Sequence, residues 1–153
     1  MHALELKIPP PLVALSVAIA MWSVASFVPL PELPPMIRKS VAIAMALAGG
    51  AFDIAGALSF RRARTTINPM KPYSTTALVS SGVYRITRNP MYVGLLFVLV
   101  SWAVFLSSAW ALLGPLAFCL YIGRFQIAPE ERVLSELFGN EYLAYKVKVR
   151  RWL

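Results

Sequence analysis

Cysteine and histidine are almost absent from this sequence of 153 residues. It contains one cysteine, Cys119, and one histidine, His2. A disulfide framework needs paired cysteines, and a zinc site takes several cysteine or histidine ligands. The composition therefore excludes a disulfide scaffold and predicts that no metal is bound.

Charged residues are also scarce. They make up 14% of the chain, against about a quarter in average soluble domains, and 58% of the residues are hydrophobic. The apolar residues fall in long unbroken runs and do not alternate with polar ones at helical or strand spacing. This pattern is typical of a protein embedded in a lipid bilayer.

The first apolar run is uncharged from Pro9 to Val28. At about 1.5 Å per residue it can cross a hydrocarbon core of about 30 Å, so we expect a membrane helix over 9–28. A cleaved signal peptide is the alternative, but the run is longer than the usual apolar part of such a peptide. Four prolines within 29–35 then predict a short, stiff turn.

The second run spans 41–60 and is interrupted only by Asp53. Gly49, Gly50 and Gly56 favour close approach of another helix. An acidic residue inside a membrane helix is a functional candidate, and Arg61 or Arg124 could pair with it; the alternative is a satisfied hydrogen bond between helices.

The third run, 91–127, carries only Arg124 as a charge and is too long for one crossing. We expect a helical hairpin that bends at Ser107–Ser108, or alternatively at Gly114–Pro115. The predicted fold is therefore one all-α integral membrane domain over 1–153, with four transmembrane helices at 9–28, 41–60, 91–106 and 109–127.

Basic residues gather in two segments that four crossings place on one side of the membrane. Six lie within 61–88 and six from residue 124 onward (Arg61, Arg62, Arg64, Lys71, Arg85, Arg88; Arg124, Arg132, Lys146, Lys148, Arg150, Arg151). Lys7 joins them, and only Arg38 and Lys39 lie opposite.

The positive-inside rule predicts that both termini, the loop 61–90 and the tail 128–153 are cytoplasmic, with a bacterial inner membrane as the simplest location. This placement accounts for the net charge of +8. The basic loop has no open surface of interleaved aromatic and basic residues, so no nucleic-acid partner is predicted.

The chain enters the third helix through a motif that suits anion binding. Asn89 is a good N-cap, Pro90 suits the first helical position, and Gly94 allows close approach one turn later. The positive helix end and Arg88 would together attract a carboxylate. The plainer alternative is that Asn-Pro only starts the helix while Arg85 and Arg88 reach lipid phosphates.

A second polar cluster, Glu130–Glu131, follows the fourth span directly after Pro129. Acidic residues also favour a helix N-terminus, which is their structural explanation. Apolar residues at helical spacing then predict an amphipathic helix on the cytoplasmic membrane face that stops near Gly139 (Val133, Leu134, Leu137, Phe138). Because the hairpin returns the chain to its starting side, we expect the two clusters to line one pocket.

These motifs resemble a known family. The order Leu-Val-x-x-Gly-x-Tyr-(x)3-Arg-Asn-Pro-x-Tyr-x-Gly begins at Leu78, Glu-Glu-x-x-Leu-(x)3-Phe-Gly-(x)2-Tyr-(x)2-Tyr begins at Glu130, and Val-x-Arg-Trp ends at Trp152. Together they look like the isoprenylcysteine carboxyl methyltransferase family and its bacterial relatives, and more distantly like phospholipid N-methyltransferases. The likeness covers residues 61–152.

The resemblance implies a membrane methyltransferase that uses S-adenosylmethionine and a lipophilic acceptor approaching from the bilayer. The acceptor would be a prenylcysteine-like carboxylate, or another lipid-like carboxylate, a thiol or an amine. Carried over by position, the cofactor pocket comprises eleven residues (Thr76, Ala77, Leu78, Val79, Tyr84, Asn89, Pro90, Met91, Tyr92, Glu130, Glu131). They supply the donors, acidic acceptors and apolar walls that this cofactor requires.

The chain departs from the family pattern at two positions. Asn89 stands where eukaryotic members carry histidine, and Gln126 stands where an arginine is thought to hold the substrate carboxylate. Arg124, two residues earlier, points about 200° away on a regular helix. We take Arg88, Arg124 and Gln126 as candidates for orienting the acceptor. With an amine acceptor, Glu130 or Glu131 becomes a possible base.

Two other functional classes compete with the enzyme. A small four-helix transporter would use Asp53 as its coupling site, and a noncatalytic membrane scaffold would need no cofactor. A scaffold would tolerate changes at Glu130 and Tyr92 without loss of cofactor affinity.

Overall fold

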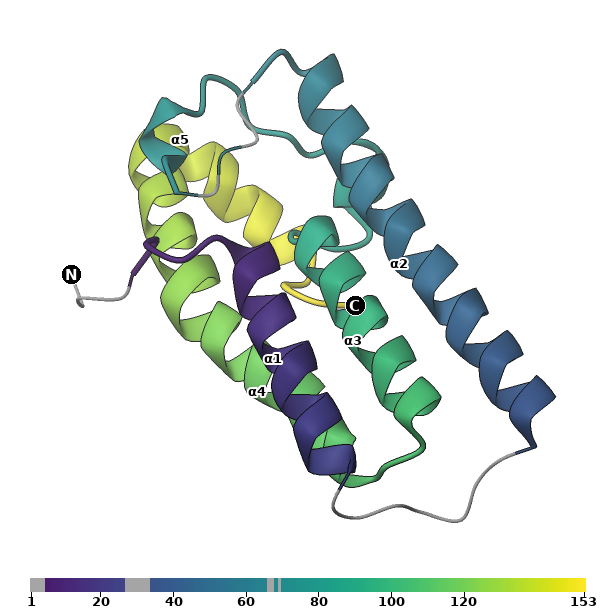
Figure 1. Cartoon of the computed structure of the whole chain (residues 1–153). Helices are drawn as coiled ribbons and strands as arrows, with labels where there is room; N and C mark the ends of the chain where they lie inside the picture. Colours follow the sequence, from purple (N-terminus) through teal and green to yellow (C-terminus); the bar gives the residue numbers. More distant parts are fainter. Residues whose placement is uncertain (1–4, 27–33, 66–67, 69) are drawn as a thin grey trace.

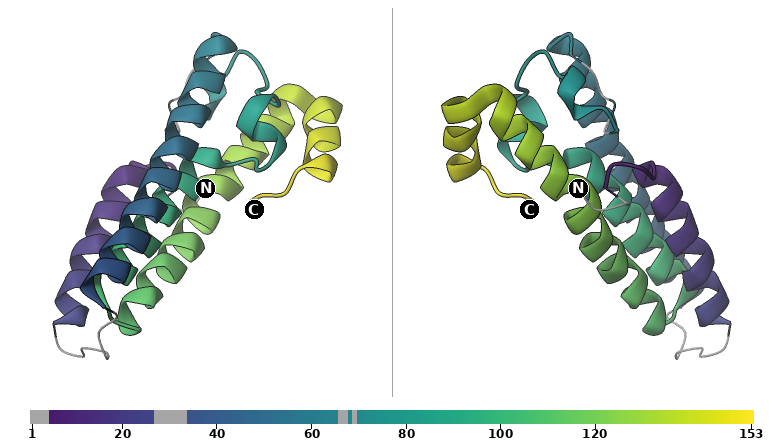
Figure 2. Two further views of the ribbon diagram at one scale, coloured as in Figure 1. Left: turned by 90° about the vertical axis from the view of Figure 1, so that its right-hand side faces the viewer. Right: turned by 90° about the vertical axis from the view of Figure 1, so that its left-hand side faces the viewer.

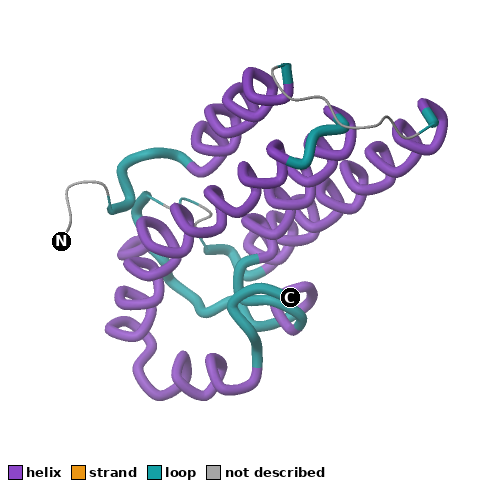
Figure 3. Tube along the Cα trace, turned by 90° about the horizontal axis from the view of Figure 1, so that it is seen from below, coloured by secondary structure: helices purple, strands orange, loops and turns teal. Residues whose placement is uncertain are grey.

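The computed structural model describes residues 5–26, 34–65, 68 and 70–153. Within these ranges every regular element is a helix, loops connect the helices, and Thr87 and Arg150 form an isolated bridge (Figure 3). The elements are α1 (Pro10–Ala25), α2 (Pro35–Arg62), η1 (Pro72–Ser74), η2 (Gly82–Arg85), α3 (Pro90–Leu106), η3 (Trp110–Leu112), α4 (Leu113–Ile122), the π-helical turn η4 (Gly123–Ile127) and α5 (Ala128–Lys148).

The helices α1, α2, α3 and α4 run alongside one another as a bundle (Figure 1). The end of α1, the start of α2 and the bend between α3 and α4 lie at one end of it. The start of α1, the segment between α2 and α3, and α5 gather at the other end. Figure 2 shows that α5 leans away from the bundle and then turns back. Segments distant in sequence therefore meet at this second end.

Two of the helices have the length of a membrane span, and exposed apolar side chains cover parts of the bundle. Among the described residues, α2 and the continuous helix from Trp110 to Lys148 are long and apolar enough to cross a bilayer, and α1 and α3 are shorter apolar helices. Large apolar side chains on α1 and α2 are more than half exposed (Leu12, Leu15, Ile19, Ile43, Leu47, Ile54). Such faces suit contact with lipid.

The uncharged part of the last long helix ends before Glu130. Charges are absent from Trp110 to Gly123 and then become frequent, with Glu130, Glu131, Arg132 and Glu136 within seven residues. Because charged side chains are costly inside a hydrocarbon core, the stretch suited to crossing a membrane does not extend into the charged part of α5.

Glycines bring α2 and α3 together, as the sequence predicts. A Cβ added at Gly49 would come within 2.7 Å of the Gly94 carbonyl oxygen, and one at Gly56 within 2.8 Å of the Met91 Cγ. The same addition at Gly50 meets nothing within 4 Å. The prediction is therefore confirmed for Gly49 and Gly56 and is wrong for Gly50, which lies on another face of the helix.

The predicted hairpin bend at Ser107–Ser108 is confirmed. The helix α3 ends at Leu106, and Ser107 takes the left-handed conformation with φ 48°. The alternative bend at Gly114–Pro115 is wrong, because both residues lie inside α4. The second helix also begins earlier than predicted: α2 starts at Pro35 rather than at residue 41, because Pro35 fits the first helical turn.

The prediction that the amphipathic helix stops near Gly139 is partly wrong. The chain kinks there, with φ 48° and ψ −124°, but α5 continues to Lys148. A glycine tolerates this positive φ, so helical chain can resume in a new direction. The second half of α5 buries Tyr142 and Tyr145 against the segment before α3, where the Tyr145 hydroxyl donates to the Tyr84 carbonyl oxygen at 2.7 Å.

The C-terminal tail is fastened to the start of α3. The Arg88 amide donates to the Arg150 carbonyl oxygen at 2.9 Å, and the Asn89 Nδ2 donates to the Arg151 carbonyl oxygen at 2.8 Å. Asn89 does occupy the N-cap position, but its side chain makes no capping hydrogen bond. The expected cap is thus replaced by a contact with the tail, which sequence spacing does not reveal.

Candidate functional site

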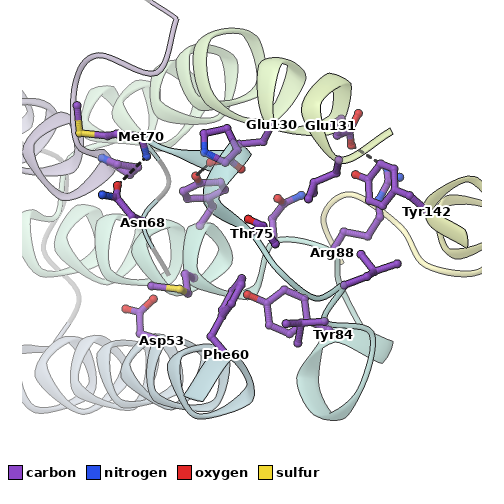
Figure 4. A pocket seen from close by; sticks show the side chains of 18 of the residues that line it. Asp53, Phe60, Asn68, Met70, Thr75, Tyr84, Arg88, Glu130, Glu131 and Tyr142 are labelled. Carbon is purple, nitrogen blue, oxygen red and sulfur yellow. Dashed lines mark hydrogen bonds and ion pairs between the residues drawn. The ribbon is translucent and has the colours of Figure 1, made fainter. Parts of the chain in front are cut away.

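A cavity of about 560 Å³ lies at the end of the bundle where α5 folds over it (Figure 4). Its walls come from the start of α1, from α2, from the segment before α3, and from α3 and α5. The volume falls within the range of about 300–1,000 Å³ that is usual for small-molecule sites.

Nine of the eleven predicted cofactor residues line this cavity (Ala77, Leu78, Val79, Tyr84, Asn89, Met91, Tyr92, Glu130, Glu131). Thr76 and Pro90 do not line it. The Thr76 hydroxyl donates to the Thr65 hydroxyl at 3.2 Å, and Thr75 lines the cavity instead. Pro90 is fully buried as the first residue of α3.

Glu130 and Tyr92 join the two sequence clusters. The Tyr92 hydroxyl donates to Glu130 Oε1 at 2.6 Å, which confirms that the clusters meet. Burial raises the pKa of Glu130 to about 8, against the opposing effect of the Tyr92 hydrogen bond and with a further increase from the Glu131 charge. Without a ligand, Glu130 is therefore largely protonated at neutral pH.

Glu131 is surrounded by cations. Arg151 donates to it through Nε at 3.1 Å and through Nη2 at 2.6 Å, and Arg88 Nη2 lies 3.1 Å from Oε1. The Lys146 Nζ lies 4.0 Å from Oε2. Glu131 therefore ties the C-terminal tail and the start of α3 to α5, and its charge is already compensated.

The Arg88 guanidinium has two nitrogen atoms without a hydrogen-bond partner among the described residues. Its side chain is 10% exposed and lines the cavity. Among the described residues, no hydrogen-bond partner reaches its buried Nε and Nη1 atoms. Buried donors are nearly always satisfied in proteins, so this guanidinium is suited to an anionic ligand in the cavity.

Arg124 and Gln126 do not line the cavity. Arg124 Nη1 lies 3.1 Å from Glu5 Oε1, and Arg132 Nη2 lies 2.6 Å from Glu5 Oε2. Gln126 is 1% exposed beside the Tyr92 hydroxyl. The π-helical turn through this region changes the direction of each side chain relative to a regular helix. The structure therefore brings only Arg88 of the three orienting candidates into the cavity.

Sequence reasoning missed several lining residues. The N-terminal segment reaches the cavity through Pro9, Pro10 and Pro11 because the Leu6 amide donates to the Phe125 carbonyl oxygen at 3.0 Å. Other missed residues come from α2, from the segment that follows it and from α5 (Asp53, Phe60, Asn68, Met70, Pro72, Thr75, Leu134, Tyr142, Tyr145). Of these residues, the sequence pointed only to Asp53, as an acidic residue within an apolar run, and to Tyr142 and Tyr145, which belong to the second motif.

The aromatic lining is electrically neutral. Burial raises the pKa of the Tyr84 and Tyr142 phenols above the usual range. The Tyr84 ring also packs edge-on against Phe60 at 5.5 Å between centroids. These side chains offer flat apolar surfaces beside the polar groups of Arg88 and Glu130.

A family comparison agrees with this arrangement. The model of the phospholipid methyltransferase family matches residues 37–141, which include most of α2, all of α3 and α4, and much of α5. The chain belongs to this family. The predicted relationship to membrane methyltransferases is thereby confirmed.

Individual relatives point the same way. The chain is 51% identical over 63 residues to an uncharacterized protein of Haemophilus influenzae, covering 41% of this chain and 100% of that protein. It is 39% identical over 79 residues to a probable protein-S-isoprenylcysteine O-methyltransferase of Oryza sativa subsp. indica, covering 50% of this chain and 40% of that protein. The chain is 40% identical over 67 residues to methanethiol S-methyltransferase 1 of Bradyrhizobium diazoefficiens, covering 44% of this chain and 22% of that protein.

The chain thus spans less than half the length of these two methyltransferase relatives. No solved structure matches it.

Proposed function

We propose that the chain is a membrane methyltransferase that binds S-adenosylmethionine in the cavity and methylates a lipophilic acceptor. The observation that carries the proposal is the convergence of Glu130, bonded to Tyr92 at 2.6 Å, and the unpartnered donors of Arg88 on one cavity. Family membership supplies the reaction class.

The residues present suit this donor. Arg88 Nε and Nη1 would hold its carboxylate, and Glu130 would accept a hydrogen bond from its ammonium or ribose hydroxyls. The apolar and aromatic lining would hold its adenine (Leu78, Val79, Tyr84, Leu134, Tyr142). When bound, the donor supplies an electrophilic methyl group on a cationic sulfur.

The chain's own contribution is positioning. Methyl transfer is an in-line displacement, so holding the acceptor about 3 Å from the methyl group supplies much of the rate. The cavity lining is largely apolar, and displacement of water by the bound substrates would strengthen attraction between an anionic or lone-pair nucleophile and the sulfonium. No covalent intermediate on the chain is required.

We further propose that all four bundle helices cross the membrane and form one domain over 1–153. Both termini and the cavity would then face the cytoplasm, in agreement with the positions of the basic residues. A water-borne donor would enter beside α5, and the acceptor would enter between the helices. Carboxylates, thiols and amines, including prenylcysteine-like carboxylates, are all compatible with the reaction.

Calorimetric titration of the detergent-purified chain with S-adenosylmethionine tests the donor site. We expect binding to the intact chain, and a loss of affinity of about 10-fold or more in Glu130→Ala and in Arg88→Leu, because each removes a charged or hydrogen-bonding partner. Glu141→Gln is the matched control, since Glu141 is exposed on the same helix α5.

Two results would contradict this proposal. Absence of binding to the intact chain would remove the enzyme hypothesis in favour of a scaffold or a transporter. Unchanged affinity in both cavity variants would place the donor elsewhere.

A further inference from the structure

Residues 5–11, here called the wall segment, form one wall of the cavity. Pro9, Pro10 and Pro11 line the cavity at the start of α1. Before them the chain extends across the helix that runs through η4 into α5 (Figure 1), and the Leu6 amide donates there to the Phe125 carbonyl oxygen at 3.0 Å. The position of this wall therefore depends on how its first residues are held.

Glu5 fastens the wall segment through two ion pairs. Its carboxylate lies 3.1 Å from Arg124 Nη1 and 2.6 Å from Arg132 Nη2, and its side chain is only 3% exposed. Burial acts to raise the pKa of Glu5, but the two arginines lower it below its usual value, so the carboxylate is ionised at neutral pH. Glu5 thus joins the wall segment to both η4 and α5.

The backbone next to Glu5 is strained. Leu6 has φ 58°, in the left-handed region that leucine rarely adopts. Such a conformation persists only where neighbouring contacts fix it. The hydrogen bond of the Leu6 amide and the ion pairs of Glu5 are contacts of this kind. Their loss would let the backbone relax and free the wall to move.

Detachment of the wall segment would be a local event. The Arg124 and Arg132 side chains are 46% and 51% exposed, so water can replace the Glu5 carboxylate on both. The rest of α1 is anchored separately by buried apolar residues (Val13, Ala14, Met21). The wall segment can therefore leave its position while the bundle stays folded.

We propose that Glu5 is a positioning residue that holds the wall segment against the cavity, and that breaking its ion pairs opens the cavity beside α1. Ligands would enter and leave through this opening, and the wall in its observed position would slow their exchange. The inference concerns access to the cavity and does not depend on which ligand the cavity takes. It also gives Arg124, which lies outside the cavity lining, a role in holding its wall.

Cysteine labelling measures the opening without turnover. The single native cysteine is first removed as Cys119→Ser, and Leu95→Cys then places a thiol on the α3 side of the cavity. We expect N-ethylmaleimide to label this thiol at least about 10-fold faster in Glu5→Gln than in the parent background, because two charge-assisted hydrogen bonds are lost.

A backbone variant tests the same contact independently. Leu6→Pro removes the amide that bonds to Phe125 and cannot adopt a positive φ. We expect it to accelerate labelling of Leu95→Cys as Glu5→Gln does. The double variant Glu5→Gln/Arg132→Gln should label no faster than Glu5→Gln alone, since both substitutions remove one shared contact.

Two controls separate movement of the wall from other effects. Glu141→Gln removes an exposed carboxylate from α5, so its labelling rate should stay within about 2-fold of the parent value. Ala103 is 3% exposed in the apolar core of the bundle, and a thiol introduced there as Ala103→Cys should stay protected in Glu5→Gln.

Each other outcome would overturn the proposal. Equal labelling of Leu95→Cys in the parent background and in Glu5→Gln would show that Glu5 does not hold the wall. Equally fast labelling in Glu141→Gln would assign the effect to net charge, and loss of protection at Ala103→Cys would show that Glu5 stabilises the whole bundle. Because no methyl donor is added, these results are independent of the test of the proposed function.

Discussion

The Tyr92 hydroxyl lies 2.6 Å from Glu130 Oε1, although the two residues are 38 positions apart. Tyr92 belongs to the first turn of α3 and Glu130 to the first turn of α5. The intervening hairpin travels the length of the bundle and returns, so these turns meet at the cavity. This hydrogen bond orients the Glu130 carboxyl group, which we propose binds the methyl donor.

Removing that hydroxyl should weaken donor binding. In Tyr92→Phe we expect the S-adenosylmethionine Kd to rise about 5-fold to 10-fold, because a hydrogen bond to a carboxylate contributes about 1–2 kcal/mol. Tyr73→Phe is the control, since the Tyr73 hydroxyl donates to Glu136 at 3.2 Å on the exposed surface. Equal Kd values for Tyr92→Phe and the parent chain would show that Glu130 does not need this orientation.

Donor binding should release protons near neutral pH. The pKa of Glu130 is about 8 in the ligand-free chain, and a cationic ligand favours the ionised carboxylate. Affinity should therefore increase as pH rises from about 6 to 7.5 and the ionised fraction grows.

Calorimetry in buffers with different ionisation enthalpies measures the number of protons released. We expect a release approaching one proton at about pH 7. Glu130→Gln should lose most of it. A proton count that Glu130→Gln leaves unchanged would assign the release to another group.

The cation cluster around Glu131 should matter for stability. Replacing Glu131 by Gln leaves the buried Arg88 guanidinium without its carboxylate, so we expect a loss of about 2–4 kcal/mol in the free energy of unfolding. Arg151→Gln should cost less, since the Arg151 side chain is 41% exposed and Arg88 keeps its partner. Thermal unfolding in detergent measures both, and the reverse order would contradict this account.

Close packing of α2 against α3 should depend on Gly94. A Cβ there would overlap Asp53 and come within 2.8 Å of the Gly49 carbonyl oxygen. We expect Gly94→Ala to destabilise the chain by about 1–3 kcal/mol through overpacking. Gly50→Ala is the matched control, because the added methyl group meets nothing within 4 Å and alanine favours a helix. A stable Gly94→Ala variant would mean that the two helices separate easily.

The sequence by itself determined the helical and membrane-embedded character of the chain. Run length and the scarcity of charge depend only on composition along the chain, and backbone hydrogen bonds inside a bilayer must be satisfied locally by a helix. The hairpin bend at Ser107 and the start of α3 at Pro90 also follow from local residues. The hairpin topology predicted that the segment entering α3 and the Glu130–Glu131 pair would line one pocket.

Only the tertiary structure decided which side chains reach the cavity. Arg124 is directed to Glu5, 119 positions away, and Asn89 is bonded to Arg151 rather than to its own helix. These contacts depend on a π-helical turn and on two terminal segments that fold back onto the bundle. Packing partners distant in sequence set the direction of these side chains, and the local spacing of residues does not reveal those partners.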